Sequence, residues 1–362
     1  MFHITPTTTP TPDADRAVLM QDPGFGRVFT EHMAVASHDD EHGWHDLTVG
    51  PLRPFEMHPA TSVLHYGQEV FEGLKAYLHD DGEVYLFRPE RNAARFATSA
   101  ARLALPVVPV EMFLASLDAL VDLDRAWVPS GGETSLYVRP FLMGTETALA
   151  VRPSLEATYA VVASPSGAFF ASGISGIRLW ATTTYTRASP GGTGGAKTGG
   201  NYAGSMLAQH EARDHGCDQV LFTGGEPGRR TLDESGAMNI LMVTTDGELL
   251  TPGLGTILEG VTRQSLLELA SDHGLRPVER VIELSWFLDA LRRGHITEVF
   301  AAGTAAVITP ILEFRGDEFD DTIVGDGRPG HATLALREQL VGIQTGQVPD
   351  RRGWLHRVPR SS

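Results

Sequence analysis

A lysine set among glycines is the feature of the sequence most able to do chemistry. The segment GGTGGAKTGGNY places six glycines around Lys197. Glycine lets the main chain approach a ligand closely and lets its N–H groups point inward. A nucleotide-binding loop needs the pattern G-x-x-x-x-G-K-[ST], but Ala196 occupies the position of the required glycine. A second alternative is a flexible surface loop with a solvated lysine.

The interpretation that we favour is a nucleophilic lysine. A lysine amine that is partly removed from water can attack an aldehyde. Pyridoxal 5'-phosphate is the usual aldehyde partner, because its ring accepts the electrons of a carbanion. Such a site also needs an acidic residue facing the pyridine nitrogen, a phosphate cup and a cation for the substrate carboxylate.

The elements that must position this lysine mix strands with helices. Strands are predicted over 83–88, 135–142, 158–166, 177–188, 219–225, 238–252 with a turn at Asp246-Gly247, and 298–311 with a turn inside it. Helices are predicted over 92–105, 111–123, 202–216 and 260–274, the last two ended by glycines. Strict βαβ alternation is missing, so we expect an α+β fold and not a doubly wound sheet.

Composition divides the chain into two expected domains behind a leader. Residues 1–15 are rich in threonine and proline and are predicted to be a disordered leader. A small N-terminal α/β domain is expected over 16–166. A connection dense in glycine and serine covers 167–178, and a larger C-terminal domain with the lysine covers 179–362.

The bulk charge and the cysteine count exclude several classes of protein. The net charge of −16 makes nucleic-acid binding a poor expectation, because such a surface repels phosphate backbones. The single cysteine, Cys217, excludes an intrachain disulfide and a thiolate metal cluster. The N-terminus has no signal-peptide pattern, and no apolar stretch is suited to a membrane span. We expect a soluble, cytoplasmic protein without a metal.

Beyond the glycine loop, the chain resembles the branched-chain amino acid aminotransferases, which are pyridoxal-phosphate enzymes of fold type IV. The matching motifs occur in the family's order and spacing over residues 64–310. They are LHYGQEVFEGLKAY, FRPERNAARF, LYVRPF, GGTGGAKTGGNYA, LDESGAMNIL, ILEGVTRQSL and EVFAAGTAAVITP. The closing GIQTGQVPDRRGW is also similar to the bacterial members. The resemblance implies two domains with the active site between them.

The resemblance also implies roles around pyridoxal 5'-phosphate. Lys197 would hold the cofactor as a Schiff base and shuttle the α-proton, and Tyr202 would hydrogen-bond the phenolic oxygen. Glu234 would face the pyridine nitrogen, and Asp233 is the alternative candidate for this role. The phosphate would be bound by Arg95, Val261, Thr262 and Thr304. Each of three residues also has a purely structural alternative. Arg95 could be a surface arginine, Glu234 a solvated acid and Tyr202 a core aromatic residue.

The implied substrate pocket is apolar with a polar rim. Tyr66, Phe71, Tyr137 and Phe169 would line it, with Tyr66, Leu149 and Val151 reaching across the interface of a homodimer. Arg139 would bind the side-chain carboxylate of glutamate. Residues two apart on a strand share a face, so Arg139 would lie on the same face as Tyr137. Backbone N–H groups of Thr304, Ala305 and Ala306 would receive the α-carboxylate. Core packing is the alternative for the aromatic residues.

These roles predict ping-pong transamination of leucine, isoleucine or valine with 2-oxoglutarate, giving branched 2-oxo acids and L-glutamate. The chain departs from the family pattern at Phe169, Ser235 and Glu259, and also at Ala150 and Ala237. An unusual apolar substrate therefore stays open. Further alternatives are a D-amino acid aminotransferase, an aminodeoxychorismate lyase and a catalytically silent cofactor-binding homologue.

Overall fold

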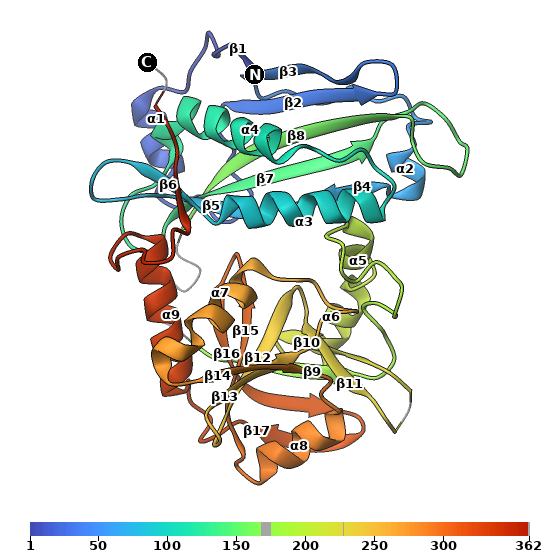
Figure 1. Cartoon of the computed structure of the whole chain (residues 1–362), viewed down its shortest axis with the longest axis vertical. Helices are drawn as coiled ribbons and strands as arrows, with labels where there is room; N and C mark the ends of the chain where they lie inside the picture. The colour runs from blue at the N-terminus through green and yellow to red at the C-terminus, as the bar shows by residue number, and fades with distance from the viewer. Residues whose placement is uncertain (168–174, 227, 361–362) are drawn as a thin grey trace. The chain divides into compact units, whose positions relative to one another are not determined.

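The fold is that of a computed structural model, which describes residues 1–167, 175–226 and 228–360. The chain divides into two compact units (Figure 1). Unit 1 comprises the described residues of 1–169, 196–199 and 342–362, and unit 2 comprises those of 170–195 and 200–341. The division differs from the predicted boundaries, because the lysine segment and the C-terminal end both group with the N-terminal part. Much of the predicted connection over 167–178 lies outside the described residues.

Unit 1 is built on one sheet that draws its strands from both ends of the chain. Among the described residues this sheet has nine strands in the order β1-β3-β2-β8-β7-β5-β6-β18, with β4 paired to β7. The strands are β1 (His3–Ile4), β2 (His32–Asp39), β3 (Gly43–Pro51), β4 (Glu69–Phe71), β5 (Leu74–Leu78), β6 (Val84–Phe87), β7 (Ser135–Gly144), β8 (Glu156–Ser166) and β18 (Leu355–Arg357). The helices are α1 (Asp13–Leu19), α2 (Val63–Tyr66), α3 (Pro89–Arg102), α4 (Val110–Leu123) and the short η1 (Arg125–Trp127).

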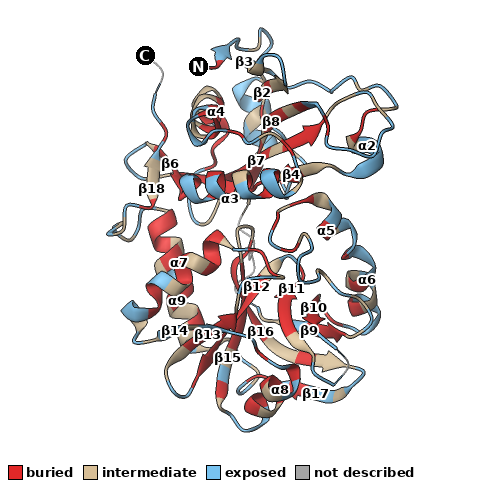
Figure 2. Ribbon diagram, turned by 45° about the vertical axis from the view of Figure 1, so that its right-hand side comes forward, coloured by how far each residue is buried: buried red, intermediate tan, exposed pale blue. Residues whose placement is uncertain are grey.

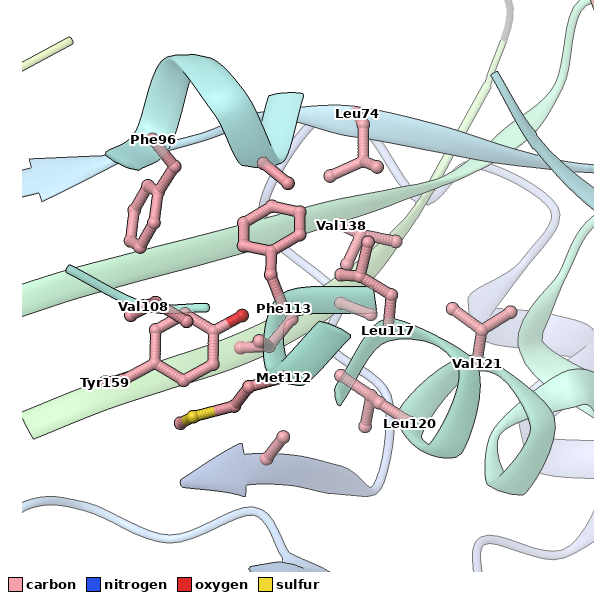
Figure 3. Close-up of a cluster of buried hydrophobic side chains, with 14 of the residues drawn as sticks. Leu74, Phe96, Val108, Met112, Phe113, Leu117, Leu120, Val121, Val138 and Tyr159 are labelled. Atoms are coloured by element: carbon pink, nitrogen blue, oxygen red, sulfur yellow. The ribbon is translucent and has the colours of Figure 1, made fainter. Parts of the chain in front are cut away.

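Helices α3 and α4 cover one face of this sheet and enclose the core of unit 1. Phe113 of α4 is fully buried and packs against both Phe96 of α3 and Tyr159 of β8, whose rings also contact each other (Figure 3). The Tyr159 hydroxyl is paired with the hydroxyl of Ser116 at 2.8 Å, so this polar atom is not left without a partner in an apolar core. Figure 2 shows α3 exposed along its other side, as expected for an amphipathic helix.

Alternation along the strands gives this sheet two chemically different faces. Val138 of β7 lies opposite Leu74 of β5, and both belong to the core under the helices. The neighbouring residues, Tyr137 and Arg139, therefore lie on the other face. This face carries the polar and aromatic groups described below.

The predicted disordered leader is wrong, since residues 1–15 are ordered against unit 1. β1 pairs in parallel with β3, and Phe2 is buried in the core. The Thr7 N–H donates to His32 Nε2 at 2.8 Å, and the other ring nitrogen is paired with Asp124 at 2.6 Å. These partners lie 25 and more residues along the chain, so a local composition rich in threonine and proline could not reveal them.

Unit 2 is organised by a sheet that closes on itself. β11 pairs with both β10 and β12, so the path β11-β10-β9-β16-β15-β12 returns to its first strand. β13 and β14 extend the sheet from β12, and β17 pairs with β16. The strands are β9 (Ile177–Thr182), β10 (Gln219–Gly224), β11 (Thr231–Ser235), β12 (Met238–Thr244), β13 (Glu248–Pro252), β14 (Arg276–Arg280), β15 (Ile296–Gly303), β16 (Val307–Gly316) and β17 (Phe319–Ile323).

Unit 2 also contains helices, of which α6, α7 and α8 pack on its strands. The helices are α5 (Gly199–Ala203), α6 (Met206–Asp214), α7 (Val261–Leu269), η2 (Ala270–His273), α8 (Leu284–Arg292) and α9 (His331–Gln344), and α9 runs on into the C-terminal part of unit 1. The single helix predicted over 202–216 is two helices, α5 and α6. The hydroxyl of Ser205 donates to the Tyr202 carbonyl at the break, which is a local bond that competes with helix formation.

The mixed order of strands and helices confirms the predicted α+β class. The predicted turn at Asp246-Gly247 lies between β12 and β13, where Gly247 has a φ of 70°. Within the described residues, none of the helices combines the length and the apolar character that crossing a bilayer requires.

We predict that Phe113→Ala lowers the free energy of unfolding by about 3–5 kcal/mol, because the surrounding core cannot collapse into the vacated space. Chemical denaturation followed by circular dichroism measures this change. Val107→Ala is the control, since Val107 is 47% exposed and its truncation is expected to cost about 0.5 kcal/mol or less. Equal effects of the two substitutions would contradict the role of Phe113 as the centre of this core.

Candidate active site

The main chain at Lys197 is hydrogen-bonded on both sides within unit 1. The Lys197 N–H donates to the hydroxyl of Ser99 on α3 at 2.9 Å, and the Lys197 carbonyl accepts the N–H of Phe71 on β4 at 2.9 Å. Its amine lies 4.7 Å from the centre of the Phe71 ring. The glycine-rich segment therefore does not behave as a free surface loop, and the position of the Lys197 backbone is set by two elements far away in sequence.

Arg95 is placed near this lysine by a buried ion pair with Glu72. Arg95 Nε and Nη2 donate to the two oxygens of Glu72 at 2.6 and 2.8 Å, and Asn92 adds a third bond at 2.8 Å. Burial alone would raise the pKa of Glu72, but the charge and hydrogen bonds of Arg95, with a smaller effect of Lys197, hold it below its usual value. Glu72 therefore stays ionised and fixes the plane of the Arg95 guanidinium.

Phe71, Tyr137 and Arg139 form a cluster on the face of the unit 1 sheet opposite the core under α3 and α4. The guanidinium carbon of Arg139 lies 4.8 Å from the centre of the Phe71 ring and 5.3 Å from that of Tyr137. Arg139 Nη2 donates to the Tyr137 hydroxyl at 2.9 Å, whereas Arg139 Nε is buried without a hydrogen-bond partner among the described residues. Phe25, which the sequence analysis did not single out, packs its ring 4.9 Å from that of Tyr137. The cluster combines apolar walls with one cation.

Tyr66, Leu149 and Val151 lie on the surface of unit 1. Their exposed fractions are 41, 62 and 86%, and the Tyr66 hydroxyl donates to the Leu149 carbonyl at 2.6 Å. The predicted pocket residue Phe169 lies outside the described residues.

Glu234 is the centre of a buried network in unit 2. One of its oxygens accepts the Asn239 amide at 2.9 Å and the Leu258 N–H at 2.7 Å. The other oxygen lies 2.8 Å from Arg187 Nε. Three donors on one carboxylate, which is 2% exposed, stabilise its ionised form. Glu234 is therefore a fixed negative charge.

Asp233, the alternative candidate for the role of Glu234, has different surroundings. Burial raises its pKa, although a hydrogen bond from Thr256 and the charge of Arg187 act to lower it. Thr256 donates to one oxygen at 2.7 Å, and the other oxygen is buried without a hydrogen-bond partner among the described residues. Adjacent residues of a strand point to opposite faces, so Asp233 cannot replace Glu234 without a change of register.

The predicted phosphate-binding residues Val261 and Thr262 are buried at the start of α7. Among the described residues, no side chain caps this helix, and the first N–H groups of a helix have no acceptor within it. A Cβ at Gly260, the N-cap residue, would overlap Asn239 Oδ1, so only glycine lets the helix begin this close to Asn239. Asn239 thus contacts both Glu234 and the N-terminus of α7.

The turn 304–306 joins β15 to β16 in the same unit. Ala302 of β15 lies opposite Asn239 of β12, which in turn lies opposite Glu234 of β11. The turn that carries Thr304, Ala305 and Ala306 therefore follows a strand that runs beside the Glu234 network. Tyr202 is half-buried in α5.

The departures from the family pattern have varied surroundings. Glu259 is exposed and accepts a hydrogen bond from Gln264, so its charge does not oppose an anion at the buried start of α7. Ser235 is fully buried, and its hydroxyl has no hydrogen-bond partner among the described residues. Nothing in the structure explains this serine. Ala150 and Ala237 are exposed.

Sequence reasoning missed three polar residues that hold the predicted ones in place: Glu72, Arg187 and Asn239. A signal for Asn239 was available, because a two-residue turn at Gly236-Ala237 pairs it directly with Glu234. Arg187 stands at the start of the glycine loop, ten residues before the lysine, where its charge could have marked it. No local pattern marks Glu72 as buried.

Comparison with known proteins shows the family of the chain. The family model described as amino-transferase class IV matches residues 69–314. The branched-chain-amino-acid aminotransferase of Mycolicibacterium smegmatis is 48% identical over 99% of this chain and 98% of its own length. The probable branched-chain-amino-acid aminotransferase of Streptomyces coelicolor is 47% identical, with 98% of each chain covered.

Solved structures are similar as well. The branched-chain amino acid aminotransferase of Escherichia coli superimposes with a TM-score of 0.74 at 26% identity, covering 91% of this chain and all of the other. The branched-chain amino acid aminotransferase from Thermobaculum terrenum, solved in its PLP form, has a TM-score of 0.73 at 25% identity, with 91% of this chain and 99% of the other covered.

We predict that Glu72→Gln destabilises the protein by about 3 kcal/mol at pH 7, because a buried guanidinium loses its counter-charge. A carboxylate with a lowered pKa stabilises the folded state above its unfolded pKa, and this contribution is lost as the pH falls through the folded pKa. The difference from wild type should therefore be largest above pH 4.5, the ordinary value for glutamate, and shrink below it.

Urea denaturation at a series of pH values measures the Glu72 effect. Glu111→Gln on the exposed side of α4 is the control and should change the free energy of unfolding by about 0.5 kcal/mol or less. A deficit of Glu72→Gln that does not vary with pH would mean that the charge of Glu72 is not its source.

Proposed function

The chain belongs to the class IV aminotransferases, and from that premise we propose that it transfers the amino group of leucine, isoleucine or valine to 2-oxoglutarate. The observation that carries this proposal is the pairing of an apolar cluster with one cation, Phe71 and Tyr137 with Arg139, on the sheet face beside the Lys197 segment. The products are branched 2-oxo acids and L-glutamate.

The donor set fits pyridoxal 5'-phosphate. The cofactor needs an amine for its aldehyde, a carboxylate for its pyridine nitrogen and donors for its phosphate. Lys197 offers the amine. Glu234 offers a buried carboxylate that its neighbours keep ionised. The uncapped start of α7, at Val261 and Thr262, offers N–H groups to an anion.

Arg95 and Thr304 would complete the phosphate site, and Tyr202 would bind the phenolic oxygen. When bound, the cofactor supplies an electrophilic carbon and a ring that withdraws electrons from the substrate. Glu234 would hold a proton on the ring nitrogen, because a fixed buried carboxylate stabilises an adjacent cation.

Lys197 is the residue to which we assign proton transfer. Its amine would take the proton from the α-carbon of the amino acid and return a proton to the reacting group. The anchored main chain limits where this amine can reach, so the proton moves between fixed positions. Backbone N–H groups of the 304–306 turn, which includes Ala305 and Ala306, would hold the α-carboxylate of the substrate.

Two different side chains must be accepted in turn at one pocket. The rings of Phe71 and Tyr137 suit a branched apolar side chain, and Phe169 would extend this wall. Arg139 suits the second carboxylate of glutamate and 2-oxoglutarate, because a guanidinium binds a carboxylate through two parallel hydrogen bonds.

A homodimer is part of the proposal. Tyr66, Leu149 and Val151 expose apolar surface on this chain, which supports contact with a second copy.

The single cysteine, Cys217, is buried and unpaired, which fits a reducing compartment, and we propose the cytoplasm.

We predict that Lys197→Ala lowers turnover by about 10²–10⁴-fold, the usual contribution of a positioned acid–base group. The chain contains two lysines, Lys75 and Lys197, so the assignment can be read directly. After borohydride treatment of the holoenzyme, peptide mass mapping should place the cofactor on Lys197. In the control Lys75→Arg, the cofactor should still be attached to Lys197. A cofactor mass on Lys75 of the wild type would contradict the assignment of Lys197.

A panel of amino donors with 2-oxoglutarate tests the proposed substrates, with L-glutamate formation as the readout. We predict turnover with L-leucine, L-isoleucine and L-valine and none with D-leucine. If no donor converts the bound cofactor in a single turnover, a catalytically silent cofactor-binding homologue is favoured. Turnover confined to D-amino acids or to a bulkier apolar donor would replace the proposed substrate.

A further inference from the structure

Glu69 is a half-buried acid for which the proposed reaction has no role. It lies on β4, two residues before Phe71, and pairs across the sheet with Met143 of β7. Phe71 pairs with Phe141 of the same strand. Because alternate residues share a face, Glu69 lies on the face that carries Phe71, Tyr137 and Arg139.

The Glu69 carboxylate holds the main chain just beyond Lys197. It accepts the N–H of Gly199, two residues after the lysine. A Cβ at position 199 would overlap this carboxylate, so the contact requires a glycine there. Together with the bond from the Phe71 N–H to the Lys197 carbonyl, strand β4 thus fixes both sides of the turn that follows the lysine.

The charge of Glu69 also acts on the surroundings of Arg139. Burial raises the pKa of Glu69, while the Gly199 hydrogen bond and the charge of Arg139 act to lower it. Within the described part of the chain, no ion pair joins the two side chains, and Arg139 instead bonds the Tyr137 hydroxyl. Arg139 is thus close enough to interact with Glu69 and still has a buried N–H without a partner among the described residues.

We propose, resting on the transamination proposed above, that Glu69 positions the Lys197 segment and sets the balance between the two substrates. A dicarboxylate brings its second negative charge to Arg139 and therefore towards Glu69. A branched apolar side chain brings no charge. The carboxylate of Glu69 then weakens the binding of 2-oxoglutarate and glutamate while leaving branched substrates unaffected.

Substitution by glutamine separates the two roles. Glu69→Gln removes the charge but keeps an oxygen that can accept the Gly199 N–H, whereas Glu69→Leu removes both. Glu83→Gln is the matched control, because it removes the same charge from the same unit at the turn before β6, beside Arg357 and Arg360.

The charge effect is measured as ligand binding to the holoenzyme by tryptophan fluorescence. The probes are glutarate, a dicarboxylate, and 4-methylpentanoate, a branched monocarboxylate. Glu69→Gln should bind glutarate about fivefold more tightly, as expected when a partly screened like charge is removed, and 4-methylpentanoate within about twofold of wild type. The KM for 2-oxoglutarate should fall in parallel, and Glu83→Gln should match wild type throughout.

The positioning role is measured on the cofactor-free protein by hydrogen–deuterium exchange of the peptide that contains Gly199. Exchange there should be at least about tenfold faster in Glu69→Leu than in wild type, because an amide that loses its acceptor opens more readily, and near wild type in Glu69→Gln. Thermal melting checks that both variants are folded.

The outcomes separate this inference from the proposed function. Glutarate affinity unchanged in Glu69→Gln, or exchange unchanged in Glu69→Leu, overturns the inference even if wild type transaminates leucine. A wild type that fails to transaminate leucine overturns the proposed function, and the exchange experiment still decides whether Glu69 holds the segment.

Discussion

Two main-chain hydrogen bonds at Lys197, to Ser99 of α3 and from Phe71 of β4, are the interactions on which the place of the lysine in unit 1 depends. They group a segment from the middle of the chain with elements about a hundred residues earlier. The same helix carries Arg95, and the same strand carries Glu69, so one packing arrangement places the amine, a guanidinium and an acid together. A glycine-rich segment could not hold a fixed position without such external partners, because glycine restricts its own backbone least.

Each unit holds a buried ion pair at a residue of the candidate site. Glu72 binds Arg95 in unit 1, and Glu234 binds Arg187 in unit 2. A buried ion without a partner costs several kcal/mol, so each pair preserves the geometry of both members. The net charge of −16 gives no general attraction for a carboxylate or a phosphate. We therefore attribute the proposed binding of anions to individual arginines and to the N-terminus of α7.

The sheet of unit 1 separates stability from chemistry by its two faces. Val138 and Leu74 point into a core closed by α3 and α4, whereas Tyr137 and Arg139 on the same strand as Val138 point the other way. A shift of register by one residue would exchange the two sets. Selection for a well-packed core thus also maintains the register of the polar face. On that face lie Glu69 and Arg139, through which we propose that two substrates of different charge are distinguished.

The sequence alone determined the α+β class, most of the strands and helices, and the family of the chain, because apolar periodicity and the order of motifs are local or linear properties. It also singled out Lys197 and Glu234. Only the tertiary structure decided what holds these residues: Glu72 against Arg95, Arg187 and Asn239 on Glu234, and β4 against the lysine segment. The composition of residues 1–15 predicts disorder, but in the folded chain β1 pairs with β3 and the Thr7 N–H donates to His32. These partners are distant in sequence, and a buried hydrogen bond depends on which groups folding brings together, which no local pattern records.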